Sequence, residues 1–269
     1  MHANVHFQCT ECGKCCHGLK LRFTLAQARA WLRDGNGVHV LIEATPWDAE
    51  PDGATPPPPA AHPDMARKQR RTFGARSGAL DCRIELLLTS AHTGACPNLG
   101  ADMRCTIYAR RPSICRVYPA DTLGLGVFSI AGKKCPPEAW RADAPAFIQG
   151  GRLVDAEMQD AIDHLNQAAE SEAEQRMRLS AALGLDRAAF VGEGYVQYVP
   201  DPAVLAAALD RVATQTPLAV QPVEPLDWTV VTNQGKTQAL LQGAGAHAER
   251  VVAAVKAPYD YHAFLPAQD

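Results

Sequence analysis

Nine cysteines are the residues of this chain best suited to chemistry. Four of them lie within eight residues near the N-terminus, in the pattern Cys9-x-x-Cys12-x-x-Cys15-Cys16. A Cys-x-x-Cys turn lets two thiolates converge on one metal ion, and Gly13 eases the tight backbone there. Because the side chains of adjacent residues usually diverge, Cys15 and Cys16 leave three alternatives: they serve different metals, they reach different atoms of one cluster, or one of them is not a ligand.

A second group of four cysteines follows later in the chain and brings the number of candidate ligands to eight. Eight thiolates are enough for two four-cysteine sites, although a shared polynuclear site would use the same number. We therefore predict the following metal ligands: Cys9, Cys12, Cys15, Cys16, Cys96, Cys105, Cys115 and Cys135. Cys82 is the ninth cysteine and stays outside the predicted site.

Charged residues beside these cysteines suit a metal–thiolate site. Four thiolates around Zn²⁺ or a [4Fe–4S]²⁺ cluster leave a formal charge of about −2, which nearby cations and hydrogen-bond donors stabilise. Arg111 and Arg116 flank Cys115 and are candidates for that role, the alternative being surface solubility. His17 could act as a substitute ligand or proton carrier and His6 is a weaker candidate, while a solvated histidine is the alternative for both.

The composition is that of a globular protein. The 269 residues suit one large domain or two small ones, and 47% hydrophobic residues can bury a sizeable core. The formal net charge of -3 gives no general attraction to nucleic acid or anionic membrane. No apolar run reaches the roughly 18 residues that span a bilayer, and the N-terminus shows no signal-peptide pattern. We expect a cytoplasmic protein with reduced cysteines, and neither nucleic acid nor membrane as a partner.

Hydrophobic periodicity and capping signals predict several regular elements. Thr24 and Gln27 fit a capping box at the start of a helix that Gly35 ends. Asp201 and Pro202 suit the start of another helix. The predicted helices span residues 24–34, 154–183, 201–209 and 237–255. The predicted strands span residues 38–42, 83–89, 125–130 and 228–231.

Residues 44–80 differ in composition from their surroundings, with Pro56 to Pro59 followed by a basic run. We predict a long, partly mobile insertion in which the basic run is a solvated loop or contacts an anionic partner. The basic run consists of Arg67, Lys68, Arg70 and Arg71. The predicted fold class is α+β, with a small cysteine-rich metal-binding module of short strands at residues 1–140 and a mainly helical region at residues 141–269.

Four cysteine-containing elements, in this order, resemble one known family. They are Phe7-Gln8-Cys9-x-x-Cys12-Gly13-x-Cys15-Cys16, Cys96-Pro97-x-Leu99, Cys105-x-Ile107-Tyr108-x-x-Arg111-Pro112 and Cys115-Arg116-x-x-Pro119. Over about residues 5–136 the chain is similar to the bacterial YkgJ-type cysteine-cluster family, a zinc- or iron-chelating domain with a CxxCxxCC signature. The same domain occurs in flagellin lysine N-methylases, and some members are labelled Fe–S oxidoreductases. The resemblance implies a metal–thiolate site, while Cys82 matches no position of the family.

Three functions follow as hypotheses. The cysteine pattern favours an iron–sulfur protein, most simply with a [4Fe–4S] cluster, that transfers electrons or modifies a protein, with a redox partner or a protein substrate. The resemblance alone suggests an S-adenosylmethionine-dependent protein lysine N-methyltransferase. For its cofactor the chain offers only Gly243-Ala244-Gly245-Ala246, a pattern that more often marks a turn or a packing position. The third hypothesis is a non-catalytic binding module stabilised by zinc, because four-cysteine zinc sites are often structural.

Overall fold

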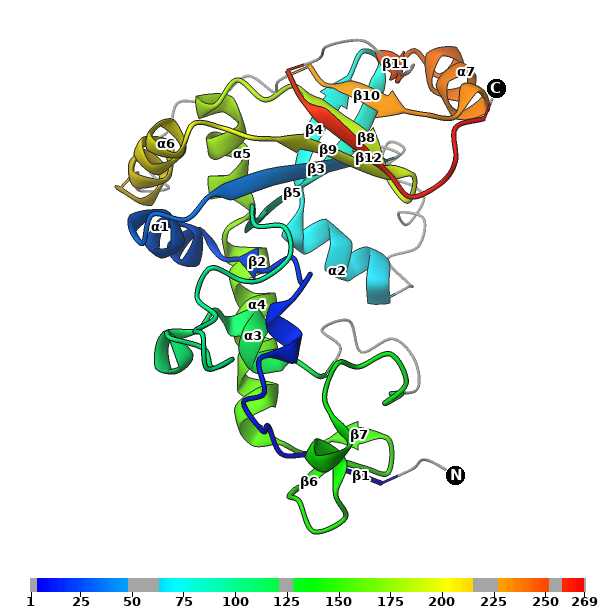
Figure 1. The fold of residues 1–269 in the computed structure, drawn as a ribbon. Coiled ribbons are helices and arrows are strands. Elements are labelled where there is room, and N and C mark those ends of the chain that lie inside the picture. The colour runs from blue at the N-terminus through cyan, green and yellow to red at the C-terminus, as the bar shows by residue number, and fades with distance from the viewer. Residues whose placement is uncertain (1–3, 48–62, 121–127, 215–226, 252–257, 269) are drawn as a thin grey trace. The chain divides into compact units, whose positions relative to one another are not determined.

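The chain forms two compact units (Figure 1). The computed structural model describes residues 4–47, 63–120, 128–214, 227–251 and 258–268. Unit 1 comprises Met1–Gln27 and Ser90–Ala168, and unit 2 comprises Ala28–Thr89 and Ala169–Asp269. Each unit thus joins two separate stretches of the chain, which differs from the regions 1–140 and 141–269 expected above. The reason is long-range pairing, since strands within residues 38–46 and 187–198 belong to one sheet.

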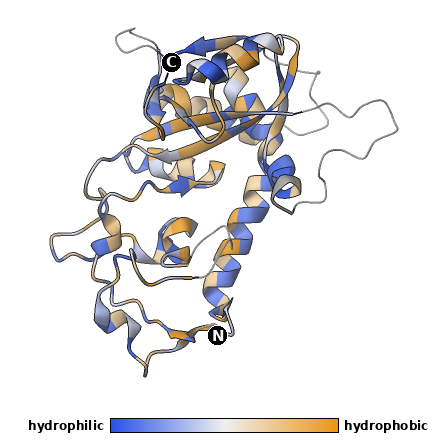
Figure 2. Cartoon of the chain, turned by 90° about the vertical axis from the view of Figure 1, so that its right-hand side faces the viewer, coloured by the Kyte–Doolittle hydropathy of each residue, from blue (hydrophilic) through white to orange (hydrophobic). Residues whose placement is uncertain are grey.

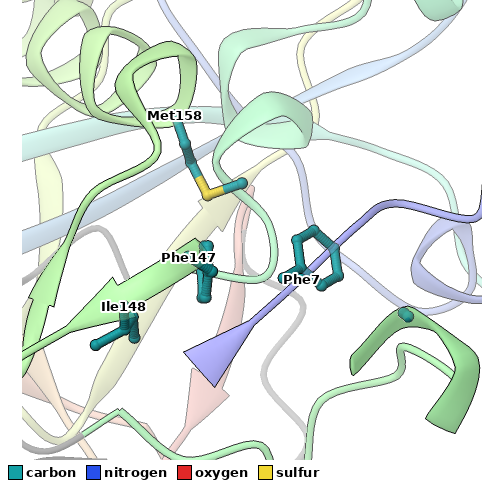
Figure 3. Packing of buried hydrophobic residues seen from close by; sticks show 5 residues of the cluster. Phe7, Phe147, Ile148 and Met158 are labelled. Atoms are coloured by element: carbon teal, nitrogen blue, oxygen red, sulfur yellow. The ribbon is translucent and has the colours of Figure 1, made fainter. Parts of the chain in front are cut away.

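A small antiparallel sheet and an aromatic cluster form the core of unit 1. The strands, in sheet order, are β1 (Val5–His6), β6 (Ala146–Gln149) and β7 (Arg152–Leu153). Phe7, Phe147, Ile148 and Met158 are buried together in this cluster (Figure 3). The ring centroids of Phe7 and Phe147 lie 5.4 Å apart, a separation typical of favourable aromatic pairs. Cys135 packs against the same cluster, so the core adjoins the last predicted ligand.

The remaining elements of unit 1 are mostly short. In chain order they are η1 (Lys14–Cys16), β2 (Arg22–Phe23), η2 (Tyr108–Arg110), α3 (Ser113–Val117) and η3 (Pro137–Trp140). Helix α4 (Ala156–Ser171) begins in this unit, where Asp155 Oδ1 accepts a hydrogen bond from the Met158 amide at 2.9 Å. The strand predicted at 125–130 lies mostly outside the described residues, and residues 128–130 are not in a strand.

Helix α1 (Leu25–Arg33) begins where the capping box predicts. The Gln27 amide donates to Thr24 Oγ1 at 3.1 Å, and the Thr24 amide donates to Gln27 Oε1 at 3.3 Å. Two backbone donors that the helix itself cannot satisfy are therefore satisfied by side chains. Gly35 follows the helix with a φ of 80°, a left-handed conformation that favours glycine. The helix predicted at 24–34 is confirmed.

A mixed sheet is the framework of unit 2. In sheet order it includes β11 (Ala248–Arg250), β10 (Thr229–Thr232), β8 (Arg187–Phe190), β3 (Val38–Pro46) and β5 (Leu80–Ser90). Three further strands belong to this sheet. β9 (Gly194–Tyr198) pairs with β3, β12 (Asp260–Ala263) pairs with β9, and β4 (Phe73–Ser77) pairs with β5. The predicted strands at 38–42 and 83–89 lie inside β3 and β5, and the one at 228–231 matches β10 to within one residue.

The helices of unit 2 are α5 (Ala173–Ala182), α6 (Pro202–Thr214) and α7 (Gly235–Gly243), with α2 described below. Asp201 caps α6 as expected, because its Oδ1 accepts hydrogen bonds from the Ala203 and Val204 amides at 2.9 and 3.1 Å. Figure 2 shows hydrophobic residues along the strands and both hydrophobic and hydrophilic residues on the helices. Fully buried side chains in this unit include Trp228, Val40, Ile42, Ile84, Leu86, Leu88, Leu179, Val196, Leu205 and Leu209.

Two predicted helices differ from the structure. The one predicted at 154–183 is divided into α4 and α5, which are separated at Glu172. The one predicted at 237–255 ends at Gly243, and β11 follows it. Gly245 turns the chain there with a φ of 80°, and a Cβ at this position would lie 2.8 Å from Ala79 Cβ. A glycine required for this close approach is what ends the apolar helical pattern.

The insertion predicted at 44–80 contains regular structure. Residues 48–62, which include Pro56 to Pro59, lie outside the described residues. The rest of the segment includes the end of β3, helix α2 (Pro63–Arg71), β4 and the start of β5. The interpretation of the basic run as a solvated loop is therefore wrong, because this run lies on α2.

Two buried carboxylates explain the position of the basic helix. Lys68 Nζ lies 3.0 Å from Glu43 Oε1, and Arg71 Nε lies 3.4 Å from Glu85 Oε1. Burial raises the pKa of Glu43, and the Lys68 charge opposes that shift. Arg70 also pairs, with its Nε 2.9 Å from a Glu170 oxygen. The basic run thus neutralises carboxylates of this unit's own strands and helices, and these partners come from distant parts of the sequence.

Helices and strands contribute to both units, so the predicted α+β class is confirmed. The region 141–269 holds helices α4 to α7 together with strands β6 to β12. In the part of the chain that the structure describes, no helix is both long and apolar enough to cross a bilayer.

Candidate metal centre

The first four cysteines lie on a loop that turns at Gly13. Gly13 has a φ of 69° and directly precedes η1, which carries Cys15 and Cys16. The Cys16 amide donates to the Gly13 carbonyl at 2.9 Å, and the Glu11 amide donates to the Cys9 sulfur at 3.4 Å. The four thiols of this loop are free and are half-buried or exposed. The four cysteines of this loop are therefore at least partly accessible to solvent and are not buried in a hydrophobic core.

A second cysteine loop lies directly against this turn. The Cys96 amide donates to the Cys16 carbonyl at 2.7 Å, and a backbone bridge closes the second loop at Cys105. A Cβ atom on Gly13 would lie only 2.3 Å from the Met103 carbonyl oxygen. Only glycine permits this approach, since it combines a left-handed conformation with the absence of a side chain.

Cys115 lies on α3 close to a cation. Burial raises the pKa of Cys115 to about 12, neighbouring thiols add to the increase, and Arg111 opposes it. The Arg111 guanidinium carbon lies 3.8 Å from the centre of the Tyr108 ring, a cation–π contact that holds the arginine in place. Arg116 donates to the Ala109 carbonyl at 2.7 Å, and its Nη1 lies 3.7 Å from Glu157 Oε1. Of the two arginines suggested by the sequence, Arg111 is the one among the largest influences on the Cys115 pKa.

Cys135 is held beside the N-terminal loop. Burial raises the pKa of Cys135 to about 11, and the charges of Cys12 and Cys9 add to this increase. Lys133 opposes the shift. The last cysteine in the sequence is therefore an electrostatic neighbour of the first two, and a lysine accompanies it as Arg111 accompanies Cys115.

Tyr118 is a site residue that the sequence does not reveal. Its hydroxyl accepts a hydrogen bond from the Lys134 amide at 2.5 Å. Burial raises the pKa of Tyr118, and among the charges that add to the increase are those of Cys135, Cys15 and Cys12. Tyrosine carries no ligand signature of its own, so only the fold shows that this hydroxyl fixes the backbone next to Cys135.

The adjacent cysteines Cys15 and Cys16 behave differently. Their side chains share a hydrogen bond, which lowers the pKa of Cys15 and raises that of Cys16. The bond therefore holds the negative charge on Cys15. Their other electrostatic neighbours also differ, because Cys9 and Cys135 act on Cys15 but not on Cys16. The three alternatives for this pair stay open, because these shifts do not decide whether both residues are ligands.

All eight predicted ligands lie in unit 1, whereas Cys82 lies in unit 2. Cys82 is 3% exposed in β5, and burial raises its pKa to about 12, with Asp81 and Asp227 adding to the increase. Among the described residues, no three side chains of metal-binding type converge closely enough to hold an ion. The eight cysteines are free thiols in one unit, and thiolates are suitable ligands for zinc or iron. Their assignment as ligands stays a prediction.

Two other sequence features have structural explanations. His6 Nδ1 donates to the Ala144 carbonyl at 2.7 Å, and the His17 carbonyl accepts a hydrogen bond from the Lys134 ammonium group. The Gly243–Ala246 segment forms the turn after α7, where the Gly245 carbonyl accepts a hydrogen bond from the Ala79 amide at 2.9 Å. That glycine pattern serves a packed turn, and the structure gives it no feature of a nucleotide site.

Comparison with known proteins identifies the cysteine-rich part of the chain. Residues 8–136 match the model of the CxxCxxCC family, described as "Putative zinc- or iron-chelating domain". The matched stretch begins just before Cys9 and ends just after Cys135, so it includes every predicted ligand. No curated protein and no solved structure matches the chain.

Proposed function

We propose, from the match of residues 8–136 to the model of the CxxCxxCC family of zinc- or iron-chelating domains, that the protein binds iron as an iron–sulfur cluster of the [4Fe–4S] type. The observation that carries the proposal is the gathering of eight free cysteines in unit 1. Thiolates are the ligands that such clusters require, and they bind zinc equally well. The adjacent pair Cys15 and Cys16, with its different surroundings, favours iron over a single zinc ion.

The roles of the protein's own residues follow from their positions. The cysteines would hold the cluster, which when bound supplies one-electron chemistry. Arg111 and Lys133 each act on a ligand thiol and would offset part of the negative charge of the thiolates. Tyr118 fixes the chain beside Cys135 through the Lys134 amide. These contacts position the ligands and moderate their charge.

We further propose a redox or protein-modification role in the cytoplasm, with a redox partner or a protein substrate. The support for a reducing compartment is that the nine cysteines are free thiols, since disulfides would be expected in an oxidising one. An S-adenosylmethionine-dependent methyltransferase has no support beyond the family resemblance, because the Gly243–Ala246 segment is explained by packing.

Anaerobic purification tests the proposal. The full-length protein should be brown, absorb at about 400 nm, and contain iron and acid-labile sulfide in equal amounts. Paramagnetic resonance after reduction should show a cluster signal. Cys82→Ser is the matched control, because it removes one cysteine outside the predicted ligands and should leave the iron content unchanged. A colourless protein with stoichiometric zinc would overturn the assignment of iron and support a zinc-stabilised binding module instead.

A further inference from the structure

Positive charge is concentrated in the cysteine-bearing part of unit 1. Residues 8–27 and 90–136 together contain nine Lys and Arg against three Asp and Glu, which gives them a formal net charge of +6. The whole chain has a net charge of -3, so its other residues carry -9. Four thiolates around a metal leave about −2, so even two such sites would not offset all of this excess. The cations therefore exceed what a metal centre needs.

Three exposed cations of this part lie on the two cysteine loops that touch each other. Lys14 directly follows Gly13, and Arg104 directly follows Met103. A Cβ on Gly13 would lie 2.3 Å from the Met103 carbonyl oxygen, so the two cations come from adjoining backbone segments. Arg110 is the last residue of η2, a few residues further along the second loop. All three side chains belong to exposed residues.

Two exposed apolar side chains lie among these cations. Met103 is 40% exposed and Tyr108 is 37% exposed. The Tyr108 amide donates to the Cys105 carbonyl at 3.3 Å, which keeps η2 next to the loop of Met103. Tyrosine, methionine and arginine are the residue types enriched where proteins contact one another. We call the following residues the basic surface: Lys14, Met103, Arg104, Tyr108 and Arg110.

Helix α4 carries the opposite charge. Between Arg152 and Arg176 the sequence contains seven Asp and Glu and no Lys or Arg. Glu157, Asp160 and Asp163 are exposed and recur every three residues, so they lie along one face of the helix. An acid in the first turn stabilises a helix, but Asp160 and Asp163 lie beyond it, and α4 contains no cation to offset them. We call these three residues the acidic face.

The basic surface and the acidic face adjoin within one copy of the protein. Arg116 connects them, because its Nη2 donates to the Ala109 carbonyl of η2 at 2.7 Å and its Nη1 lies 3.7 Å from Glu157 Oε1. Both surfaces belong to unit 1. When two surfaces of opposite charge adjoin on one compact unit, a two-fold axis between them brings each surface against the other one of a second copy.

From this arrangement we propose that the protein forms a two-fold symmetric dimer in which the basic surface of each copy contacts the acidic face of the other. The charge complementarity is used twice, because such an interface is isologous. Met103 and Tyr108 supply apolar contact area between the charges. An external acidic protein would explain the basic surface alone, whereas a second copy accounts for both surfaces. The inference does not depend on which metal the cysteines bind.

Sedimentation equilibrium of the full-length protein, purified anaerobically, tests the dimer. The dissociation constant should rise at least about tenfold between about 0.01 M and 1 M salt, as the Debye length falls from about 30 to 3 Å. Arg104→Glu with Arg110→Glu should weaken association at least about tenfold, as should Asp160→Lys with Asp163→Lys, because each double variant opposes like charges. An equimolar mixture of the two double variants should restore the dimer, since one variant then has two acidic surfaces and the other two basic ones.

Arg211→Glu with Lys236→Glu is the matched control, because it reverses two exposed cations of unit 2 with the same change in net charge. It should associate as the unmodified protein does, and circular dichroism verifies that each variant is folded. An unmodified protein that is monomeric at low salt overturns the proposal. If that monomer binds poly-L-glutamate and the Arg104→Glu, Arg110→Glu variant does not, the basic surface serves an external acidic protein instead. A mixture of the two folded double variants that stays monomeric overturns the proposal as well.

Discussion

Gly13→Ala tests whether the two cysteine loops must be in close contact to bind metal. Alanine in the left-handed conformation at φ 69° costs about 1–2 kcal/mol. Its Cβ would also lie 2.3 Å from the Met103 carbonyl oxygen and 2.9 Å from Leu99 Cδ1. The backbone oxygen would have to retreat by about 0.7 Å to restore a 3.0 Å contact, and overpacking of this kind costs about 1–3 kcal/mol more.

Gly94→Ala is the matched control for this prediction. Gly94 has a φ of 81° and lies two residues before Cys96, but no atom lies within 4 Å of a Cβ placed there. It should therefore bear the conformational cost alone. Because the predicted ligands lie on both loops, the additional cost in Gly13→Ala should lower metal affinity by about tenfold or more relative to Gly94→Ala.

A Co²⁺ titration in competition with a chelator measures this difference, and urea unfolding of the metal-loaded proteins measures the accompanying loss of stability. Equal affinities for Gly13→Ala and Gly94→Ala would refute the reasoning. That result would mean that the contact between the Gly13 turn and the loop at Met103 does not contribute to the metal-bound state.

Four further predictions concern metal content and stability. Cys12→Ser should lower metal content in elemental analysis and destabilise unit 1, because metal-binding energy is also folding energy there. Cys82→Ser should keep its metal but lose about 1–3 kcal/mol in urea unfolding, because it places a hydroxyl in a buried strand. Lys68→Met should cost about 3 kcal/mol near neutral pH by leaving Glu43 buried without its cation. Burial raises the folded-state pKa of Glu43 above its unfolded value, and the lost Lys68 contact matters only when Glu43 is ionised, so this deficit should grow as the pH rises through that raised pKa and shrink in acid. Chelation should reduce hydrogen-exchange protection in unit 1 and leave the strands of unit 2 protected, since Cys82 is the one cysteine there.

Local signals predicted much of the fold. The capping box of Thr24 and Gln27, the aspartate at 201 and the apolar strand at 83–89 depend on neighbouring residues, and the structure has an element at each of them. The failures involve distant partners. The basic helix α2 is stabilised by Glu43 and Glu85, which no local pattern connects with it. Likewise, the early end of α7 depends on Ala79 approaching Gly245.

For the candidate site, too, the sequence predicts which residues take part but not how they are arranged in space. Cysteine is recognisable as a ligand from its chemistry and spacing alone, so all eight candidates could be named from the sequence. Their grouping could not, because it depends on backbone contacts such as the one between Cys96 and Cys16. Tyr118 was missed for the same reason, since its relation to Cys135 is purely spatial.

The predicted ligands would give a bound metal a structural role as well as a chemical one. Unit 1 is built from Met1–Gln27 and Ser90–Ala168, and the chain between these stretches belongs to unit 2. Four of the predicted ligands lie in the N-terminal stretch and four in the later stretch. A metal centre that took thiolates from both stretches would crosslink them, and by closing a long intervening loop it would restrict the unfolded chain as a disulfide does. Loss of the metal would then weaken the association of the two halves of unit 1 without any change in the sheet of unit 2.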